Sequence, residues 1–178
     1  IVPDNVGTLE YAFRNRNEAE NYLFGCYSTM QRLHDVIYNP GFTISAEIVY
    51  PILETQYFNS SGFNFIRGTQ NTGNPVLSQW DNMYKAIRRC NIMLENIDKP
   101  VDLREPEKTR WIAETKFLKA YYHYYLIRMY GPVILVDENN PIDVDIELTK
   151  RKRATLDESF NYVVSLLDEA IPDLPPFI

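Results

Sequence analysis

Residues 112–133 limit the possible folds of this chain more than any other stretch, because they read as one aromatic-rich helix with a marked end. Gly131 can adopt the positive φ with which many helices terminate, and Pro132 cannot continue a helix. Apolar side chains recur on two stripes of this helix. The first consists of Trp111, Leu118, Tyr122, Tyr125 and Met129, with Thr115 at the gap, and the second of Ala113, Phe117, Ala120, Tyr121 and Tyr124. Because a helix that is apolar on two sides is normally enclosed by its neighbours, we expect stacked helices with a wide buried seam.

Composition excludes two classes of protein. The net charge of −6 argues against a nucleic-acid-binding protein, whose domain is usually basic. The longest apolar runs are too short for a transmembrane helix. The chain starts at Ile1 with neither an initiator Met nor an apolar signal segment, so we expect a piece of a larger protein.

Apolar periodicity predicts two helices before the long one. The first covers about residues 18–33, after an N-cap at Asn17, and residues 1–16 are expected to be extended. The second covers about residues 77–97.

The long helix and the last helix have recognisable starts. Asp102 is a candidate cap for the long helix, Pro106 is tolerated in its first turn, and Tyr130 ends it. Thr155 and Glu158 form a capping box that begins the last helix. Its predicted apolar face consists of Leu156, Phe160, Val163, Leu167 and Ile171.

The sequence therefore predicts an all-α fold, with helix pairs that resemble tetratricopeptide repeats, in a single helical domain over residues 1–178. The spacing of Trp80 and Trp111 does not match a strict tetratricopeptide repeat, so this interpretation rests on the layout of helix pairs. A long irregular loop separates the first and second helices.

This loop, residues 38–75, is the expected ligand site. Loops of such length in compact domains are usually functional or disordered, and its many aromatic residues favour an ordered loop. Sugars present apolar faces and polar hydroxyl rims, which suit aromatic rings mixed with amides and arginine. The candidate binding residues are Tyr57, Phe58, Asn59, Phe65, Arg67, Gln70 and Asn71. The alternative is that Phe63 and Phe65 only anchor the loop to the scaffold.

Several polar residues within the helices have structural interpretations. We expect Glu114 to pair with Arg110 rather than act as a general acid or base. Asn91 is expected to satisfy a neighbouring backbone group. His34 and His123 lack a second ligand at metal-binding spacing, so no metal site is predicted.

No phosphate-binding glycine loop or nucleophile elbow occurs, so we expect neither an enzyme nor a cofactor. Cys26 and Cys90 fall at apolar helix positions, where a free cysteine behaves as a small hydrophobic residue, and their spacing carries no disulfide-framework signature. The basic run at residues 150–153 is expected to be solvated or locally paired.

Short motifs extend along nearly the whole chain: Pro3–Asn5, Asn17–Leu23, Gly25–Tyr27, Trp80–Tyr84, Ala86–Asn91, Glu114–Tyr122, Tyr130–Val133 and Leu167–Ala170. Together they resemble the SusD/RagB family of outer-membrane nutrient-binding proteins. Three positions depart mildly from the family pattern: Cys90 and Thr115 replace the usual Ala, and Lys119 replaces the usual Arg.

The resemblance implies that the chain is the N-terminal part of a longer, mostly helical SusD-like protein. It implies a lipoprotein on the surface of the outer membrane, with a lipid anchor that would precede Ile1. Such a protein partners a SusC-like TonB-dependent transporter and passes it an oligosaccharide or another nutrient. The alternative is a helical-repeat scaffold that binds proteins and has no small-molecule ligand.

Overall fold

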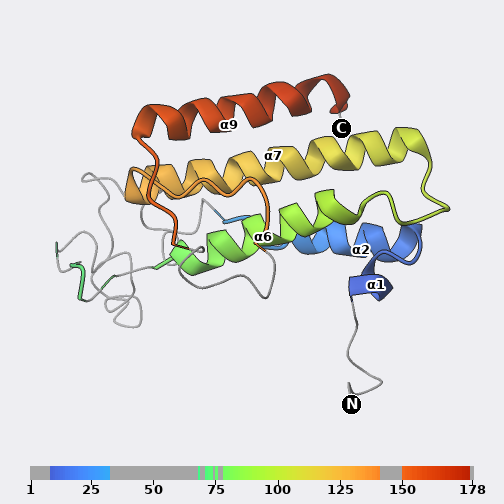
Figure 1. The fold of residues 1–178 in the computed structure, drawn as a ribbon, viewed down its shortest axis with the longest axis horizontal. Helices are drawn as coiled ribbons and strands as arrows, with labels where there is room; N and C mark the ends of the chain where they lie inside the picture. The colour runs from blue at the N-terminus through green and yellow to red at the C-terminus, as the bar shows by residue number, and fades with distance from the viewer. Residues whose placement is uncertain are drawn as a thin grey trace, which may run out of the picture. The chain divides into compact units, whose positions relative to one another are not determined.

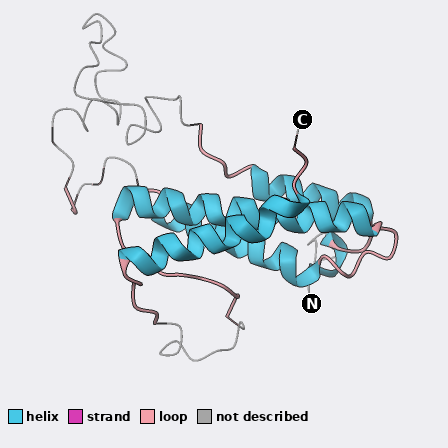
Figure 2. Ribbon diagram, turned by 90° about the horizontal axis from the view of Figure 1, so that it is seen from above, coloured by secondary structure: helices cyan, strands magenta, loops and turns pink. Residues whose placement is uncertain are grey.

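The computed structural model describes residues 9–32, 68, 71–73, 75, 78–140 and 150–176. The chain divides into two units, one formed by residues 1–29 and 82–178 and the other by residues 30–81. The elements of the described residues are helices joined by loops (Figure 2). They are α1 (Leu9–Ala12), α2 (Arg16–Tyr27), α6 (Trp80–Asn96), α7 (Glu105–Tyr130), α9 (Leu156–Ala170) and a 3₁₀ turn at Ile171–Asp173. The all-α fold class is confirmed.

Helix α7 lies between α9 on one side and α2 and α6 on the other (Figure 1). Helix α9 runs antiparallel to α7, and Lys116 Nζ of α7 lies 2.7 Å from Glu169 Oε2 of α9. Helix α2 runs parallel to α7, because Arg16 and Glu107 pair near the N-termini of both helices, with 2.8 Å between Arg16 Nη2 and Glu107 Oε1. Neighbours on opposite sides therefore enclose the long helix, as its two apolar stripes predict.

The first stripe of α7 forms the core. Its members Trp111, Thr115, Leu118, Tyr122 and Tyr125 are each at most 1% exposed. Thr115 fits this apolar row because its hydroxyl donates to the carbonyl of Trp111, at 2.7 Å. The expected buried seam is confirmed along this stripe.

The second stripe of α7 is only partly covered. Ala113 and Ala120 are buried, whereas Phe117 and Tyr124 are 37% and 40% exposed. This side of α7 forms one wall of an apolar groove of about 310 Å³ whose other wall is α9. The groove is lined by Phe117, Ala120, Tyr121, Tyr124, Phe160, Val163, Val164 and Leu167.

The N-terminal region differs from the prediction. Asn15, not Asn17, caps α2, because Asn15 has an extended backbone and its Oδ1 accepts from Glu18 N at 3.0 Å. Asn17 already lies inside the helix. Helix α2 ends at Tyr27, before the predicted end, and a short helix, α1, occupies part of the stretch expected to be extended.

Local sequence predicts the start of α9 correctly but not the N-cap of α7. Arg104 is the N-cap of α7 and makes no side-chain capping bond. The predicted cap, Asp102, instead accepts a hydrogen bond from Arg16 N at 2.7 Å, so a tertiary contact takes its carboxylate. The capping box of α9 is confirmed, with both reciprocal bonds between Thr155 and Glu158 present.

The ends of α6 and α7 agree with the predictions. Helix α6 lies within the predicted range 77–97. Helix α7 ends at Tyr130, and Gly131 follows with φ 71° and ψ −132°. A side chain would be strained in this conformation, so glycine is required there.

The predicted apolar face of α9 is partly wrong. Its buried residues are Ser159, Val163, Leu166 and Ala170. Of the predicted face, Leu156, Phe160 and Ile171 are 45%, 41% and 63% exposed. The residues buried at positions 159 and 170 are small, Ser and Ala, and a prediction based on side-chain size favours the larger residues next to them.

Leu118 and Phe117 provide a test of which α7 stripe is the core. Leu118→Ala should lower the free energy of unfolding by about 2–5 kcal/mol, because it leaves a cavity at a fully buried site. Phe117→Ala should cost less, about 1–2 kcal/mol, because that ring is partly solvated before the change. Urea denaturation of both variants measures the difference, and equal losses would contradict the assignment.

Candidate functional site

Most of the predicted ligand residues lie outside the described residues. These are Tyr57, Phe58, Asn59, Phe65, Arg67 and Gln70, and Phe63 and His34 lie outside as well. Asn71 is described: it is exposed, and its Oδ1 accepts from Gly73 N at 2.9 Å in a local turn. The loop site therefore remains a prediction.

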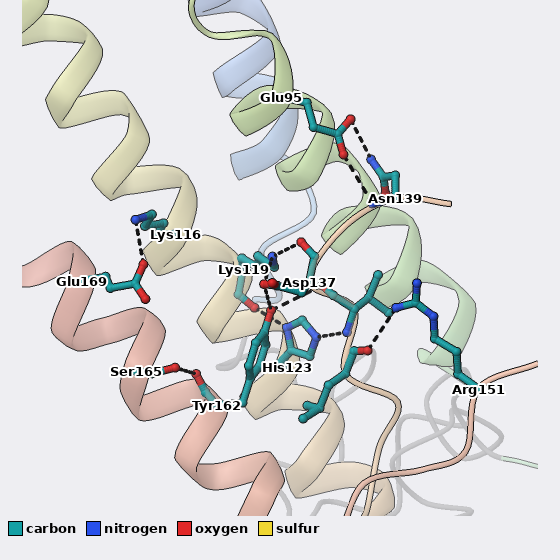
Figure 3. A network of polar contacts seen from close by, with 12 residues as sticks. Glu95, Lys116, Lys119, His123, Asp137, Asn139, Arg151, Tyr162, Ser165 and Glu169 are labelled. Atoms are coloured by element: carbon teal, nitrogen blue, oxygen red, sulfur yellow. Dashed lines mark hydrogen bonds and ion pairs between the residues drawn. The ribbon is translucent and has the colours of Figure 1, made fainter. Parts of the chain in front are cut away.

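A polar cluster joins α7, α9 and residues 131–140, here called the crossing segment (Figure 3). Lys119 of α7 is 2% exposed, and its Nζ lies 2.7 Å from the Asp137 carbonyl oxygen and 3.4 Å from Asp137 Oδ1. Tyr162 of α9 donates its hydroxyl hydrogen to the same carboxylate oxygen at 3.0 Å. Asp137 thus links both helices to the crossing segment.

His123 completes the cluster as a neutral ring. Its Nδ1 lies 2.8 Å from the Lys119 carbonyl oxygen, which can only accept, so we assign the hydrogen to Nδ1. Its Nε2 accepts from Val136 N at 3.4 Å. Burial lowers the pKa of His123 to about 4, and the Lys119 charge acts in the same direction. A second ring proton would meet the Val136 N–H, so the site favours the neutral form.

The pKa values of the remaining ionisable groups in the cluster depend on burial and on the charges and hydrogen bonds of their neighbours. Burial lowers the pKa of Lys119, although the Asp137 carboxylate partly offsets this effect. Burial also acts to raise the pKa of Asp137, but the Tyr162 hydroxyl and the Lys119 ammonium outweigh it and hold the pKa below its ordinary value. Burial, followed by the Asp137 charge, raises the pKa of Tyr162. Because these groups are already hydrogen-bonded to one another, the cluster is suited to holding the crossing segment rather than to proton transfer.

The sequence alone does not single out this cluster. The available signal is the polar pair Lys119 and His123, four residues apart within a largely apolar helix, which places both side chains on one face. Their partners Asp137 and Tyr162 come from other segments, and nothing local to α7 indicates them.

The crossing segment is also fixed to α6. The Tyr84 hydroxyl donates to the Ile134 carbonyl at 3.0 Å and accepts from the Ile134 N–H at 2.9 Å. Farther along, Asn139 N donates to Glu95 Oε1 at 3.4 Å (Figure 3). Contacts to three helices therefore position this segment.

The basic run at residues 150–153 is paired with nearby residues. This is one of the two arrangements expected from the sequence. Arg151 Nη2 donates to Asn140 Oδ1 at 2.6 Å, and Arg153 Nη1 donates to the Pro132 carbonyl at 3.3 Å. The Ala154 N–H donates to the Val133 carbonyl at 2.8 Å. These residues hold the entry to α9 beside the crossing segment.

Two predictions for polar residues have opposite outcomes. Glu114 pairs with Arg110 as expected, at 3.1 Å, and also accepts from the Tyr27 hydroxyl at 3.0 Å. The prediction for Asn91 is wrong, because its buried amide has no hydrogen-bond partner within the described part of the chain. Asn96, in the last turn of α6, donates to the Ile92 carbonyl instead, at 2.7 Å.

The described residues were also compared with the requirements of a metal site and of a membrane-spanning helix. Across the described ranges, no group of three or more His, Cys, Asp or Glu residues is placed to hold a metal ion. The helices in those ranges are also too short or too polar to cross a membrane.

The fold is that of an all-helical protein with antiparallel helix pairs, and comparison identifies its family. A family model described as "Starch-binding associating with outer membrane" matches residues 45–176. This match covers most of the sequence, and the chain belongs to the SusD-like family.

Individual relatives support the fold. A SusD-like protein of Bacteroides ovatus is 26% identical over 97 residues, which are 53% of this chain and 17% of that protein. The structure of a SusD-like protein from Bacteroides fragilis has a TM-score of 0.76 at 23% identity, over 94% of this chain and 31% of that one. A laminarin-binding SusD-like protein has a TM-score of 0.73 at 24% identity, over 93% and 36%. The chain thus spans about a third of the length of these solved relatives.

The neutral His123 predicts a pH-dependent stability. Its pKa is lowered to about 4 from an unfolded value of 6.5, so the unfolded state binds more protons between these values. The free energy of unfolding should therefore be highest above pH 6.5 and fall by about 3 kcal/mol on acidification to pH 4. Chemical denaturation across this range measures the slope. His123→Gln should remove this contribution from the slope, and an unchanged slope would contradict the neutral assignment.

Proposed function

We propose that this chain is the helical portion of a cell-surface glycan-binding protein that delivers nutrients to an outer-membrane transporter. The observation that carries this proposal is the match of residues 45–176 to a family described as starch-binding and associated with the outer membrane. A relative of similar fold is named as binding laminarin, which is also a glucan. The proposed ligand is accordingly an oligosaccharide.

In this proposal the packed helices give support and the loop binds the ligand. Helix α7 and the cluster around Lys119 and Asp137 give a fixed helical base. Rigid bases commonly carry binding residues on loops. The proposed contacts are the rings of Tyr57 and Phe58 against sugar C–H faces, with Arg67 and Asn71 bonding to hydroxyls.

The proposed partner is a SusC-like TonB-dependent transporter, and the proposed anchor is a lipid outside this chain. The family description, which includes association with the outer membrane, supports this placement. The chain's own role would be binding rather than catalysis, in keeping with the mutual pairing of Lys119, Asp137 and Tyr162.

A protein-binding scaffold without a small-molecule ligand is the second candidate. The apolar groove between α7 and α9 favours it, because Phe117, Tyr124 and Phe160 remain 37–41% exposed there. Contiguous exposed apolar side chains commonly mark protein contacts.

Calorimetric titration with maltooligosaccharides and with laminarin oligosaccharides tests the glycan proposal. We expect saturable binding of at least one series, weakened about tenfold by Tyr57→Ala and by Arg67→Ala, a loss of about 1.4 kcal/mol each. Tyr11→Ala is the matched control, because Tyr11 is 59% exposed on α1, outside the predicted loop, and its removal should leave the affinity unchanged.

Two results would change the proposal. Binding that both loop variants leave intact would remove the loop from the site. Absence of binding to either series would favour the scaffold instead.

A further inference from the structure

Helix α6 contacts the C-terminal end of α2 through Arg89. Arg89 Nη1 of α6 lies 3.5 Å from the carbonyl oxygen of Gly25, in the last turn of α2. It also lies 3.3 Å from Oγ1 of Thr29, just past the end of that helix. The next residue along each helix is a cysteine, Cys26 on α2 and Cys90 on α6. The contact thus brings the two cysteine-bearing turns together.

Both cysteines are buried. Each is 0% exposed, and each is a free thiol in the structure. The backbone of Cys26 is held in place from α7, because the Tyr122 hydroxyl donates to its carbonyl. Hydrogen bonding to the Cys26 thiol, followed by burial, raises the pKa of the Cys90 thiol. The two thiols therefore lie within hydrogen-bonding reach of each other and are shielded from solvent.

We propose that Cys26 and Cys90 form an intrachain disulfide that joins α2 to α6. The oxidant is an organic disulfide, such as oxidised glutathione or the active-site disulfide of an oxidoreductase. One cysteine thiolate attacks the oxidant's disulfide and releases its first thiolate. The other cysteine thiolate then attacks the mixed disulfide and releases the second. The pair loses two electrons and two protons in total, and the oxidant becomes two thiols.

Burial sets the order of events. A thiol with a raised pKa and no exposed surface is a poor nucleophile in the folded protein. Exchange therefore takes place while the chain folds, before α2 and α6 close over the sulfur atoms. Once formed, the bond is equally shielded from reductants.

The position of the bond has a consequence for the predicted ligand loop. The covalent ring closed between positions 26 and 90 contains all of residues 38–75. The disulfide fixes the two helices that precede and follow this loop, and so restricts the unfolded chain around it.

Refolding of the chain in a glutathione redox buffer, compared with refolding in dithiothreitol, tests the proposal. We expect the oxidised monomer to lose the mass of two hydrogen atoms and to show no thiol reactive toward Ellman's reagent in denaturant. Its Tm should exceed that of the reduced protein by about 10 °C, because the bond closes a long loop.

Cys90→Ala is the matched control. Its remaining Cys26 has no partner, so it should stay a thiol or take up glutathione, with a Tm that does not rise on oxidation. The mass and thiol count of the unmodified chain decide the question even if this variant does not fold. A folded protein that keeps both thiols, carries glutathione or links to a second copy would overturn the proposal.

Discussion

Helix α7 has to be covered along most of its length, and the other described helices of its unit are arranged to do this. Trp111, Tyr122 and Tyr125 are almost fully buried, and each such side chain contributes about 1.5–3 kcal/mol of transfer free energy. One helix cannot cover two sides of another, so α9 lies on one side and α2 and α6 lie on the other. The tyrosines also need polar partners inside the core. The Tyr122 hydroxyl finds one in the Cys26 carbonyl, which ties the burial of α7 to the position of α2.

The same burial leaves polar groups of α7 that need partners from outside the helix. Lys119 and His123 lie on the covered side of α7, where an unpaired charge or ring nitrogen would be costly. The crossing segment supplies the carbonyl and carboxylate of Asp137 and the N–H of Val136. An extended backbone can present donors and acceptors to a helix in a way that another helix, with its own groups bonded, cannot. The polar cluster therefore orders the crossing segment, which has no regular structure of its own.

Local chemistry in the sequence predicts much of the helical fold. Gly131 has the positive φ expected at a helix end, and Thr155 with Glu158 forms the expected capping box, because both features depend on residues a few positions apart. The prediction fails where tertiary contacts compete. Asp102 bonds to Arg16 rather than to its own helix, and the buried face of α9 includes the small residue Ser159. For the candidate site, the sequence offers His123 no second metal ligand, but it cannot show that Asp137 and Tyr162 are its neighbours. The loop residues remain a prediction from composition, because side-chain type indicates a ligand class without fixing geometry.

Amide hydrogen exchange followed by mass spectrometry tests most directly whether α7 is the structural centre. Amides that open only on global unfolding exchange most slowly. Peptides covering the first α7 stripe, from Trp111 to Tyr125, should be the slowest in the helices of this unit, slower than peptides of α9, whose outer side is solvated. Exchange in α7 that is as fast as in α9 would contradict the account, because it would mean that the long helix opens without the loss of its neighbours.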